Sequence, residues 1–378
     1  ECAMKMWAIV AILLLGMSLL PSCREKSQMS SRAVVTAIGI DADGDGGCAL
    51  SVQAVEALKT AGSLSQQEGN ATRVYTGGGQ TVSAALGSFI STLGRSAYIL
   101  HNQAIVVGME QAQQQTLTTL TDYFMRNYQG RPLVDMVMAR GRAEDVLRVP
   151  SAAYAVPAEQ LTTLLEEAAQ WGMAVRTHLL DVERANSGMF DAVMPIVAIQ
   201  GEGEEQMLVT DGTAFFRDGE YAGELDAAGT RGLLYGRNEM QRCLYTLDTE
   251  RWGAVSLQVS DVSTTVSVQE NGKTAAFTFS VSCRAEILEE HSTGEADKAL
   301  LEDMSERLEQ KIAEDVEGML DVTIRQNGCD VLGLCRRLKK QAPSVIRGFE
   351  EEWPDRLRDC QYVVEVSAQV NSVGAQIS

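Results

Sequence analysis

Residues Val255–Glu286 read VSLQVSDVSTTVSVQENGKTAAFTFSVSCRAE, and this stretch decides the class of fold. Apolar and polar residues alternate through 255–260, 264–269 and 274–286, which predicts three strands that each bury one face. The Asn-Gly pair between the last two strands is a strong signal for a hairpin turn. Long antiparallel strands of this kind favour a multi-domain α+β fold, with mostly antiparallel or mixed sheets packed against helices.

A long helix and a last strand follow these strands. Ala296–Thr323 is the longest helical pattern of the chain, and its opposite face is dense in charged residues, which indicates a solvated face rather than a site. Shorter helices over 331–340 and 343–350 and a strand over 362–370 complete the expected C-terminal domain, residues 251–378. The apolar positions of the long helix recur every three or four residues and are Leu301, Met304, Leu308, Ile312, Val316 and Leu320.

We expect residues 207–250 to form a small middle domain. The alternative is that this segment and the C-terminal domain form one unit. Leu208–Arg217 and Tyr221–Leu225 predict a hairpin across an Asp-Gly turn. Arg231 follows in a segment flanked by glycines, which we interpret as a loop. An exposed guanidinium there could bind a carboxylate of a partner protein. The alternative, favoured by the many acids nearby, is an ion pair within the chain.

Residues 32–200 alternate strands with helices and form the expected N-terminal α+β domain. The Gly- and Glu-rich segment 200–206 is the best candidate for a domain boundary. Strands are predicted over 32–40, 48–58, 73–76, 98–107 and 133–139, and helices over 81–93, 117–126, 142–148 and 161–171.

Two turns of this domain resemble ligand-binding loops. Asp41–Gly46, DADGDG, matches the first half of an EF-hand loop, but Val52 stands where the bidentate carboxylate is needed and strands flank the turn. We therefore interpret it as a solvated hairpin turn and expect no metal site. Gly77-Gly78-Gly79 precedes a helix, yet neither a Walker spacing nor a GxGxxG pattern is present, so a tight turn with positive φ is the better interpretation.

The segment Met4–Cys23 has the features of an export signal: a lysine, an apolar run over 6–20, and Pro-Ser-Cys. As a helix the run is about 22 Å long, short of the ~30 Å of a bilayer core. A cysteine directly after a small residue predicts a lipoprotein signal peptide, residues 1–22, with Cys23 acylated and 23–31 as a tether. A plain signal peptide with an incidental cysteine is the alternative. Glu1-Cys2-Ala3 ahead of Met4 indicates that the true start codon encodes Met4.

The chain of 378 residues carries a formal charge of −19. This excludes nucleic acid as an expected partner, because nucleic-acid binding rests on cationic contacts to phosphate. It also disfavours adhesion to an anionic membrane by charge. An acidic protein at a membrane needs another kind of anchor, and two acyl chains provide one.

Cysteines and histidines offer no convincing active site. Three histidines occur, His101, His178 and His291, and we interpret each as structural or exposed, with His101 as a hydrogen-bonding anchor at the start of a strand. We expect free or buried thiols and no zinc site, because no CxxC occurs and the spacings are wide; a disulfide among the last four is the alternative. Besides Cys2 and Cys23 the cysteines are Cys48, Cys243, Cys283, Cys329, Cys335 and Cys360.

An ordered series of short motifs resembles the Ger(x)C family, the lipoprotein C subunits of spore nutrient germinant receptors. The resemblance covers roughly residues 23–375, and one departure is that Arg24-Glu25 directly follows Cys23, where the family commonly has Trp-Asp. The matching blocks are VTAIGID (35–41), GQT (79–81), AAL (84–86), HNQAIVVG (101–108), TDYFMR (121–126), DGTAFF (211–216), TRGLL (230–234), CDVLG (329–333) and Glu352-Trp353.

The resemblance implies a three-domain α+β protein on the outer leaflet of the spore inner membrane. It implies assembly with integral membrane A-type and B-type receptor subunits, a response to small nutrients, and no catalytic residues or cofactors. We therefore expect a non-enzymatic receptor subunit, lipid-anchored on the extracytoplasmic face.

Two other functions remain as alternatives. The first is an extracytoplasmic solute-binding lipoprotein of a transporter, which the antiparallel run over 255–286 disfavours because such proteins usually have two parallel-sheet lobes. The second is a surface hydrolase acting on cell wall, which needs a carboxylate pair, a metal site or a Cys/His nucleophile.

Overall fold

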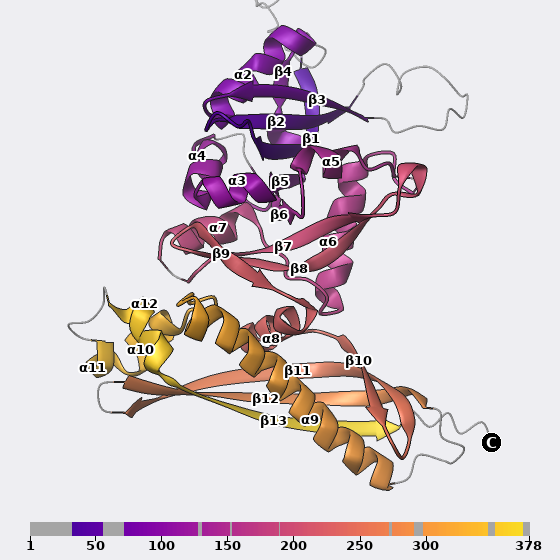
Figure 1. Cartoon of the computed structure of the whole chain (residues 1–378), viewed down its shortest axis with the longest axis vertical. Helices are drawn as coiled ribbons and strands as arrows, with labels where there is room; N and C mark the ends of the chain where they lie inside the picture. The colour runs from indigo at the N-terminus through magenta and orange to yellow at the C-terminus, as the bar shows by residue number, and fades with distance from the viewer. Residues whose placement is uncertain are drawn as a thin grey trace, which may run out of the picture.

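The computed structural model describes residues 32–55, 72–127, 131–151, 153–188, 190–271, 274–290, 298–346 and 352–372. These residues form two lobes stacked along the longest axis of the molecule (Figure 1). The N-terminal lobe is residues 32–225 and the C-terminal lobe is residues 226–372. The predicted signal peptide, Cys23 and the tether lie outside the described residues.

The N-terminal lobe is built on a mixed sheet of order β3-β2-β1-β5-β6-β7-β8-β9, with β4 beside β1. Strands β1, β5, β6 and β7 run parallel, and antiparallel hairpins extend the sheet at both ends. The strands are β1 (Arg32–Ala42), β2 (Cys48–Val55), β3 (Thr72–Gly79), β4 (Ser96–Tyr98), β5 (Ala104–Gly108), β6 (Asp135–Ala139), β7 (Val193–Gln200), β8 (Met207–Arg217) and β9 (Glu220–Leu225).

Helices cover both faces of this sheet, so successive residues of a central strand enter different cores. In β5, Ile105 and Val107 pack with α2, α4 and α7, whereas Ala104 and Val106 pack with α5 and α6. The helices are α2 (Val82–Leu93), α3 (Met109–Gln114), α4 (Leu117–Arg126), α5 (Ala143–Arg148), α6 (Pro157–Gln170) and α7 (Leu179–Asn186), with 3-10 turns η2 (Ile99–His101) and η3 (Gly203–Glu205).

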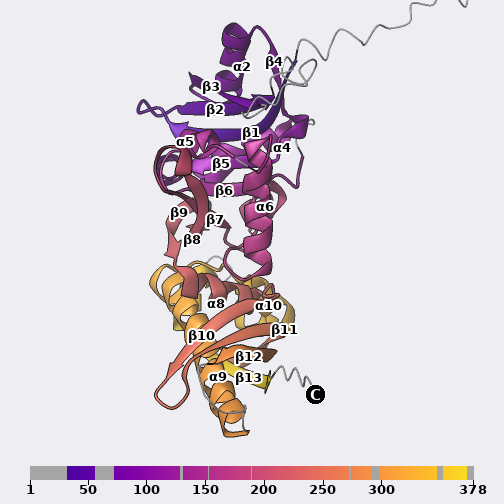
Figure 2. The same cartoon turned by 90° about the vertical axis from the view of Figure 1, so that its right-hand side faces the viewer.

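The C-terminal lobe has a four-stranded sheet of order β10-β11-β12-β13, antiparallel except that β13 runs parallel to β12. Helices α8 and α9 pack on one face of this sheet, and α9 crosses its strands obliquely (Figures 1 and 2). The strands are β10 (Cys243–Thr249), β11 (Gly253–Asn271), β12 (Thr274–Glu290) and β13 (Gln361–Ser372). The helices are α8 (Ala227–Arg237), α9 (Lys298–Leu320), α10 (Leu334–Gln341), α11 (Pro343–Ile346) and α12 (Trp353–Arg356), with a π-helical turn η4 (Asp321–Gln326) and a 3-10 turn η5 (Leu357–Asp359).

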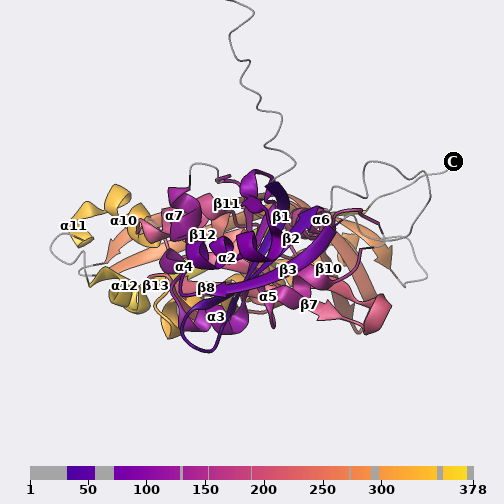
Figure 3. The same ribbon diagram turned by 90° about the horizontal axis from the view of Figure 1, so that it is seen from above.

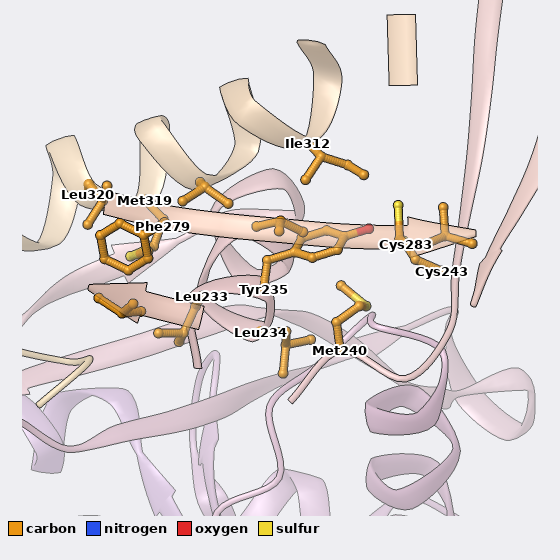
Figure 4. Close-up of a cluster of buried hydrophobic side chains, with 14 of the residues drawn as sticks. Leu233, Leu234, Tyr235, Met240, Cys243, Phe279, Cys283, Ile312, Met319 and Leu320 are labelled. Carbon is orange, nitrogen blue, oxygen red and sulfur yellow. The ribbon is translucent and has the colours of Figure 1, made fainter. Parts of the chain in front are cut away.

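One hydrophobic core continues across the junction of the lobes. Val193, Phe215 and Leu225 of the N-terminal lobe belong to the same cluster as the core of the C-terminal lobe. At its centre the fully buried Tyr235 of α8 points its hydroxyl toward Cys243 and Cys283 (Figure 4). Seen from above, down the long axis, the N-terminal lobe lies over the C-terminal lobe (Figure 3). The lobes therefore meet through packed side chains and not only through a linker.

The hairpins predicted from the sequence are present. The predicted strands 208–217 and 221–225 correspond to β8 and β9, and 274–286 lies within β12, paired with β11. The predictions for 255–260 and 264–269 are one strand, β11, whose register shifts between Ser260 and Ser263, where Asp261 has a positive φ of 49°.

The paired strands can be compared with the predicted domains and with the predicted glycine turn. Residues 207–250 form no separate sheet among the described residues: β8 and β9 extend the N-terminal sheet, whereas β10 joins the C-terminal sheet. The segment 200–206 connects two paired strands, β7 and β8, and the domain boundary expected there stays a prediction. Gly77–Gly79 lie in β3 and none has a positive φ, so the predicted tight turn is wrong. Gly79 is needed for another reason: α2 packs so closely on this strand that a Cβ there would lie 2.6 Å from the nitrogen of Ala85.

Candidate functional site

Arg231 lies on α8 and not in a loop. Asp226 caps the N-terminus of this helix by accepting from the Gly229 nitrogen at 2.8 Å, and Asn238 ends it in a left-handed conformation. Glycines occur within the helix because α8 packs directly on α9: a Cβ at Gly232 would overlap the carbonyl oxygen of Asp315. Of the two glycines that suggested a loop, Gly232 is required by the close packing of α8 on α9.

The guanidinium of Arg231 forms an ion pair within the chain. Its Nε donates to Asp315 Oδ2 at 2.8 Å, and the Tyr245 hydroxyl donates to the same oxygen at 3.0 Å. Lys311 Nζ lies 3.3 Å from Asp315 Oδ1. The Asp315 side chain is only 1% exposed, so this pair links α8 to α9 inside the fold. Burial disfavours the charge of Arg231, but the hydrogen bond and charge of Asp315 outweigh it and raise the pKa of Arg231.

Arg231 also lines a cavity of about 600 Å³ between the lobes. Arg140 lines the same cavity and donates to Asp211 and Glu224, each at 2.6 Å. Glu224 also accepts from the Tyr221 hydroxyl at 2.7 Å. These groups satisfy one another, and the cavity is a solvent-accessible part of the lobe junction.

Two further polar contacts join the lobes. The buried hydroxyls of Thr213 in β8 and Thr230 in α8 lie 2.9 Å apart. Asp191 accepts from the backbone nitrogen of Asp330 at 2.6 Å and from that of Asp218 at 3.3 Å. Burial raises the pKa of Asp191 to about 6.

The carboxylates of the acidic turn Asp41–Gly46 have two structural roles, which are to close the turn and to cap a helix. Asp43 accepts from the backbone nitrogens of Asp45 and Gly47, which closes the exposed turn. Asp41 is buried and accepts from the nitrogens of Ala143 and Glu144 at 2.7 and 2.9 Å, so it caps α5. Within the described residues, no group of three His, Cys, Asp or Glu side chains could hold a metal ion.

The cysteines from Cys48 to Cys360 are free thiols, and only Cys335 is more than slightly exposed. Burial raises the pKa of Cys243 to about 12 and that of Cys283 to about 11. Burial likewise raises the pKa of Cys329 to about 12. These thiols are therefore protonated near neutral pH and are weak nucleophiles.

The histidines are dispersed. His101 is exposed on η2, beside the Tyr98 ring at 6.0 Å, and the predicted strand 98–107 is interrupted at this turn. His178 begins α7, where its backbone nitrogen donates to Asp181 Oδ2 at 3.0 Å. His291 lies outside the described residues.

Among the residues the structure describes, no helix is long and apolar enough to cross a membrane.

Two family models together match almost the whole chain. Residues 25–199 match the spore germination protein N-terminal domain, and residues 211–374 match the model described as spore germination B3/GerAC like, C-terminal. The chain belongs to the Ger(x)C family. Membership supports a role as a C subunit of a germinant receptor. Proteins of the Ger(x)C family are not known as enzymes.

A curated relative and a solved structure agree with this assignment. Spore germination protein KC of Bacillus subtilis (strain 168) is 22% identical over 401 residues, which cover 96% of this chain and 93% of the relative. The crystal structure of the GerBC protein superposes with a TM-score of 0.60 at 15% identity, covering 88% of this chain and 96% of that one. The α+β fold of this Ger(x)C protein is therefore shared with GerBC.

Several Ger(x)C blocks meet at the lobe junction. The block at 211–216 supplies Asp211 and Thr213, and the block at 230–234 supplies Thr230 and Arg231. In the block at 329–333, Asp330 caps α10 by accepting from the nitrogens of Leu334 and Cys335 at 2.7 and 2.8 Å. Sequence reasoning singled out only Arg231. Asp191 lies in none of the quoted blocks, and its role depends on segments that are distant in sequence.

Proposed function

We propose that this Ger(x)C protein is a lipid-anchored subunit of a spore germinant receptor and has no catalytic activity of its own. The observation that carries the proposal is the ordered match of both family models, which begins at residue 25, two residues after Cys23. Cys23 would carry the acyl chains, and the acidic body would lie on the outer leaflet of the spore inner membrane. Integral membrane A-type and B-type subunits would be its partners in the response to small nutrients.

The structure supports a binding role more than a chemical one. Arg231, Asp315 and Lys311 form ion pairs inside the protein, and the thiols with pKa values of about 11 to 12 are protonated at neutral pH. Arg231 remains a proposed partner contact only through its exposed part, since its side chain is 21% exposed and its Nε is bonded to Asp315.

Deletion in the source organism tests the proposal. Spores without the protein should form in normal yield but lose germination in response to the nutrient of their receptor, and the wild-type gene should restore it. Unchanged nutrient-triggered germination, in a strain without a second copy of the receptor, would contradict the proposal. Tight stoichiometric binding of amino acids or sugars by this protein alone would favour a solute-binding lipoprotein instead.

A further inference from the structure

A second junction cavity, of about 320 Å³, has an unusual charge for this protein. It lies between α7, the start of β7, the end of α8 and the segment that leads into α10. Its lining contains more basic than acidic side chains, in a chain whose formal charge is −19. The charged lining residues are Arg176, Arg184, Arg237, Arg337, Asp181 and Glu239.

Two of these arginines are neutralised inside the protein. Arg176 lies 3.0 Å from Asp135 Oδ1, and Arg184 lies 3.2 Å from Asp181 Oδ1. For Arg237 and Arg337, the described residues provide no carboxylate within ion-pair distance. Arg237 and Arg337 therefore give the lining its excess of positive charge, which Glu239 offsets in part.

Arg237 is held in place by hydrogen bonds, although no carboxylate of the described residues lies within ion-pair distance of it. Its Nε and Nη2 donate to the carbonyl oxygen of Val331 at 2.9 and 2.7 Å, and its guanidinium lies 5.6 Å from the centre of the Phe190 ring. A carbonyl dipole orients the guanidinium but does not cancel its charge. Burial lowers the pKa of Arg237, and the charges of Glu239, Asp181 and Asp330 offset this only in part.

A neighbouring cavity of about 380 Å³ extends the basic lining. It shares Phe190, Leu332 and Arg337 with the first cavity and adds Arg336 and Lys340 of α10. Lys340 adds a positive charge along the approach to Arg337 and Arg237.

We propose that the cavity between α7, α8 and α10 binds a small oxyanion, a carboxylate or a phosphate group, held by Arg237 and Arg337. Guanidinium groups suit such a ligand because their planar array of donors matches carboxylate and phosphate oxygens. A volume of about 320 Å³ fits a small molecule or a headgroup and not a folded partner. The inference goes beyond the proposed receptor role and does not rest on it.

Calorimetric titration of the full-length lipidated protein in a non-ionic detergent, at low salt, tests the site. The probes are inorganic phosphate, succinate and glycerol phosphate, the last being a fragment of an anionic lipid headgroup. At least one probe should bind saturably, and Arg337→Gln should weaken that binding at least tenfold. Preference for glycerol phosphate would assign the site to a lipid headgroup, and preference for phosphate or succinate to a free anion.

The matched control is Lys339→Gln, which removes one positive charge from the same helix at an exposed position that lines neither cavity. It should leave the affinity within twofold of the wild type. Arg337 is the test position because Arg237 also holds the Val331 carbonyl and its loss could unfold the loop. Absence of saturable binding to all three probes would overturn the proposal, as would an equal loss in both variants when their thermal unfolding matches the wild type.

Discussion

The two lobes bury their sheets in different ways. In the N-terminal lobe helices cover both faces, and all residues of β5 and β6 are buried. In the C-terminal lobe one face meets α8 and α9, and residues along β11 alternate between buried and exposed through most of its length. A sheet with one exposed face shows its periodicity in the sequence, whereas a sheet covered on both faces does not.

The junction combines the features of both lobes. It is lined by apolar residues of one continuous core and by buried polar contacts that pair a residue of one lobe with a residue of the other. Because the two lobes share this core, we expect changes at the junction to affect both lobes, and changes within one lobe to affect mainly that lobe.

The largest expected effect is at the contact of α8 with α9. Gly232→Ala should lower the free energy of unfolding by about 3 kcal/mol, because the added methyl would overlap the Asp315 carbonyl. Gly318→Ala, on the exposed side of α9 with open space around its Cβ, should instead raise it by about 0.5–1 kcal/mol. Denaturant unfolding measures both, and equal effects would contradict the tight packing of α8 on α9.

Asp191 should make the stability of the junction depend on pH. Its folded pKa of about 6 exceeds its ordinary value of 3.8, so between these values the folded state holds the proton more tightly than the unfolded state. Stability should therefore fall by roughly 2–3 kcal/mol as pH rises from about 4 to about 6. Asp191→Asn should remove this part of the pH dependence in denaturant titrations, whereas Asp218→Asn, at an exposed position, should keep it. Parallel profiles for Asp191→Asn and the wild type would contradict the assignment.

Within the N-terminal lobe, Asp41→Ala should cost about 2 kcal/mol, because it leaves the nitrogens of Ala143 and Glu144 without an acceptor. Asp45→Ala, at the exposed tip of the same turn, should change stability by less than about 0.5 kcal/mol. Hydrogen exchange should locate the loss at α5 and β1 and leave β11 and β12 protected. Loss of protection in both lobes would show that this change is not local.

The smallest effect concerns the hydroxyl pair of Thr213 and Thr230. Thr213→Val should cost about 1 kcal/mol, because it leaves the buried Thr230 hydroxyl without its partner. Thr230→Val should have a similar cost, and the double variant should cost less than the sum of the two. The double-mutant cycle measures this coupling. Strict additivity would show that the two hydroxyls do not interact.

The sequence predicted the strands of the C-terminal lobe better than those of the N-terminal lobe, because only the C-terminal sheet has one exposed face. The alternation in 255–286 identified β11 and β12, and the 3.6-residue period identified α9. The sequence did not predict that β1, β5, β6 and β7 pair in parallel. These strands are buried on both faces, so their apolar residues do not alternate with polar ones. Arg231 stands out in the sequence as a charged residue among glycines, but the sequence does not indicate Asp315, which is 84 positions away in the chain.

The measurement that tests the central claim most directly is fractionation of cells that express the full chain and are fed labelled palmitate. We predict that the protein incorporates label and fractionates with membrane, and that Cys23→Ala abolishes labelling and releases or mislocalises the protein. Cys335→Ala, a change at a cysteine within the folded body, should behave as the wild type. Continued labelling and membrane association of Cys23→Ala would contradict the account of a lipid-anchored receptor subunit.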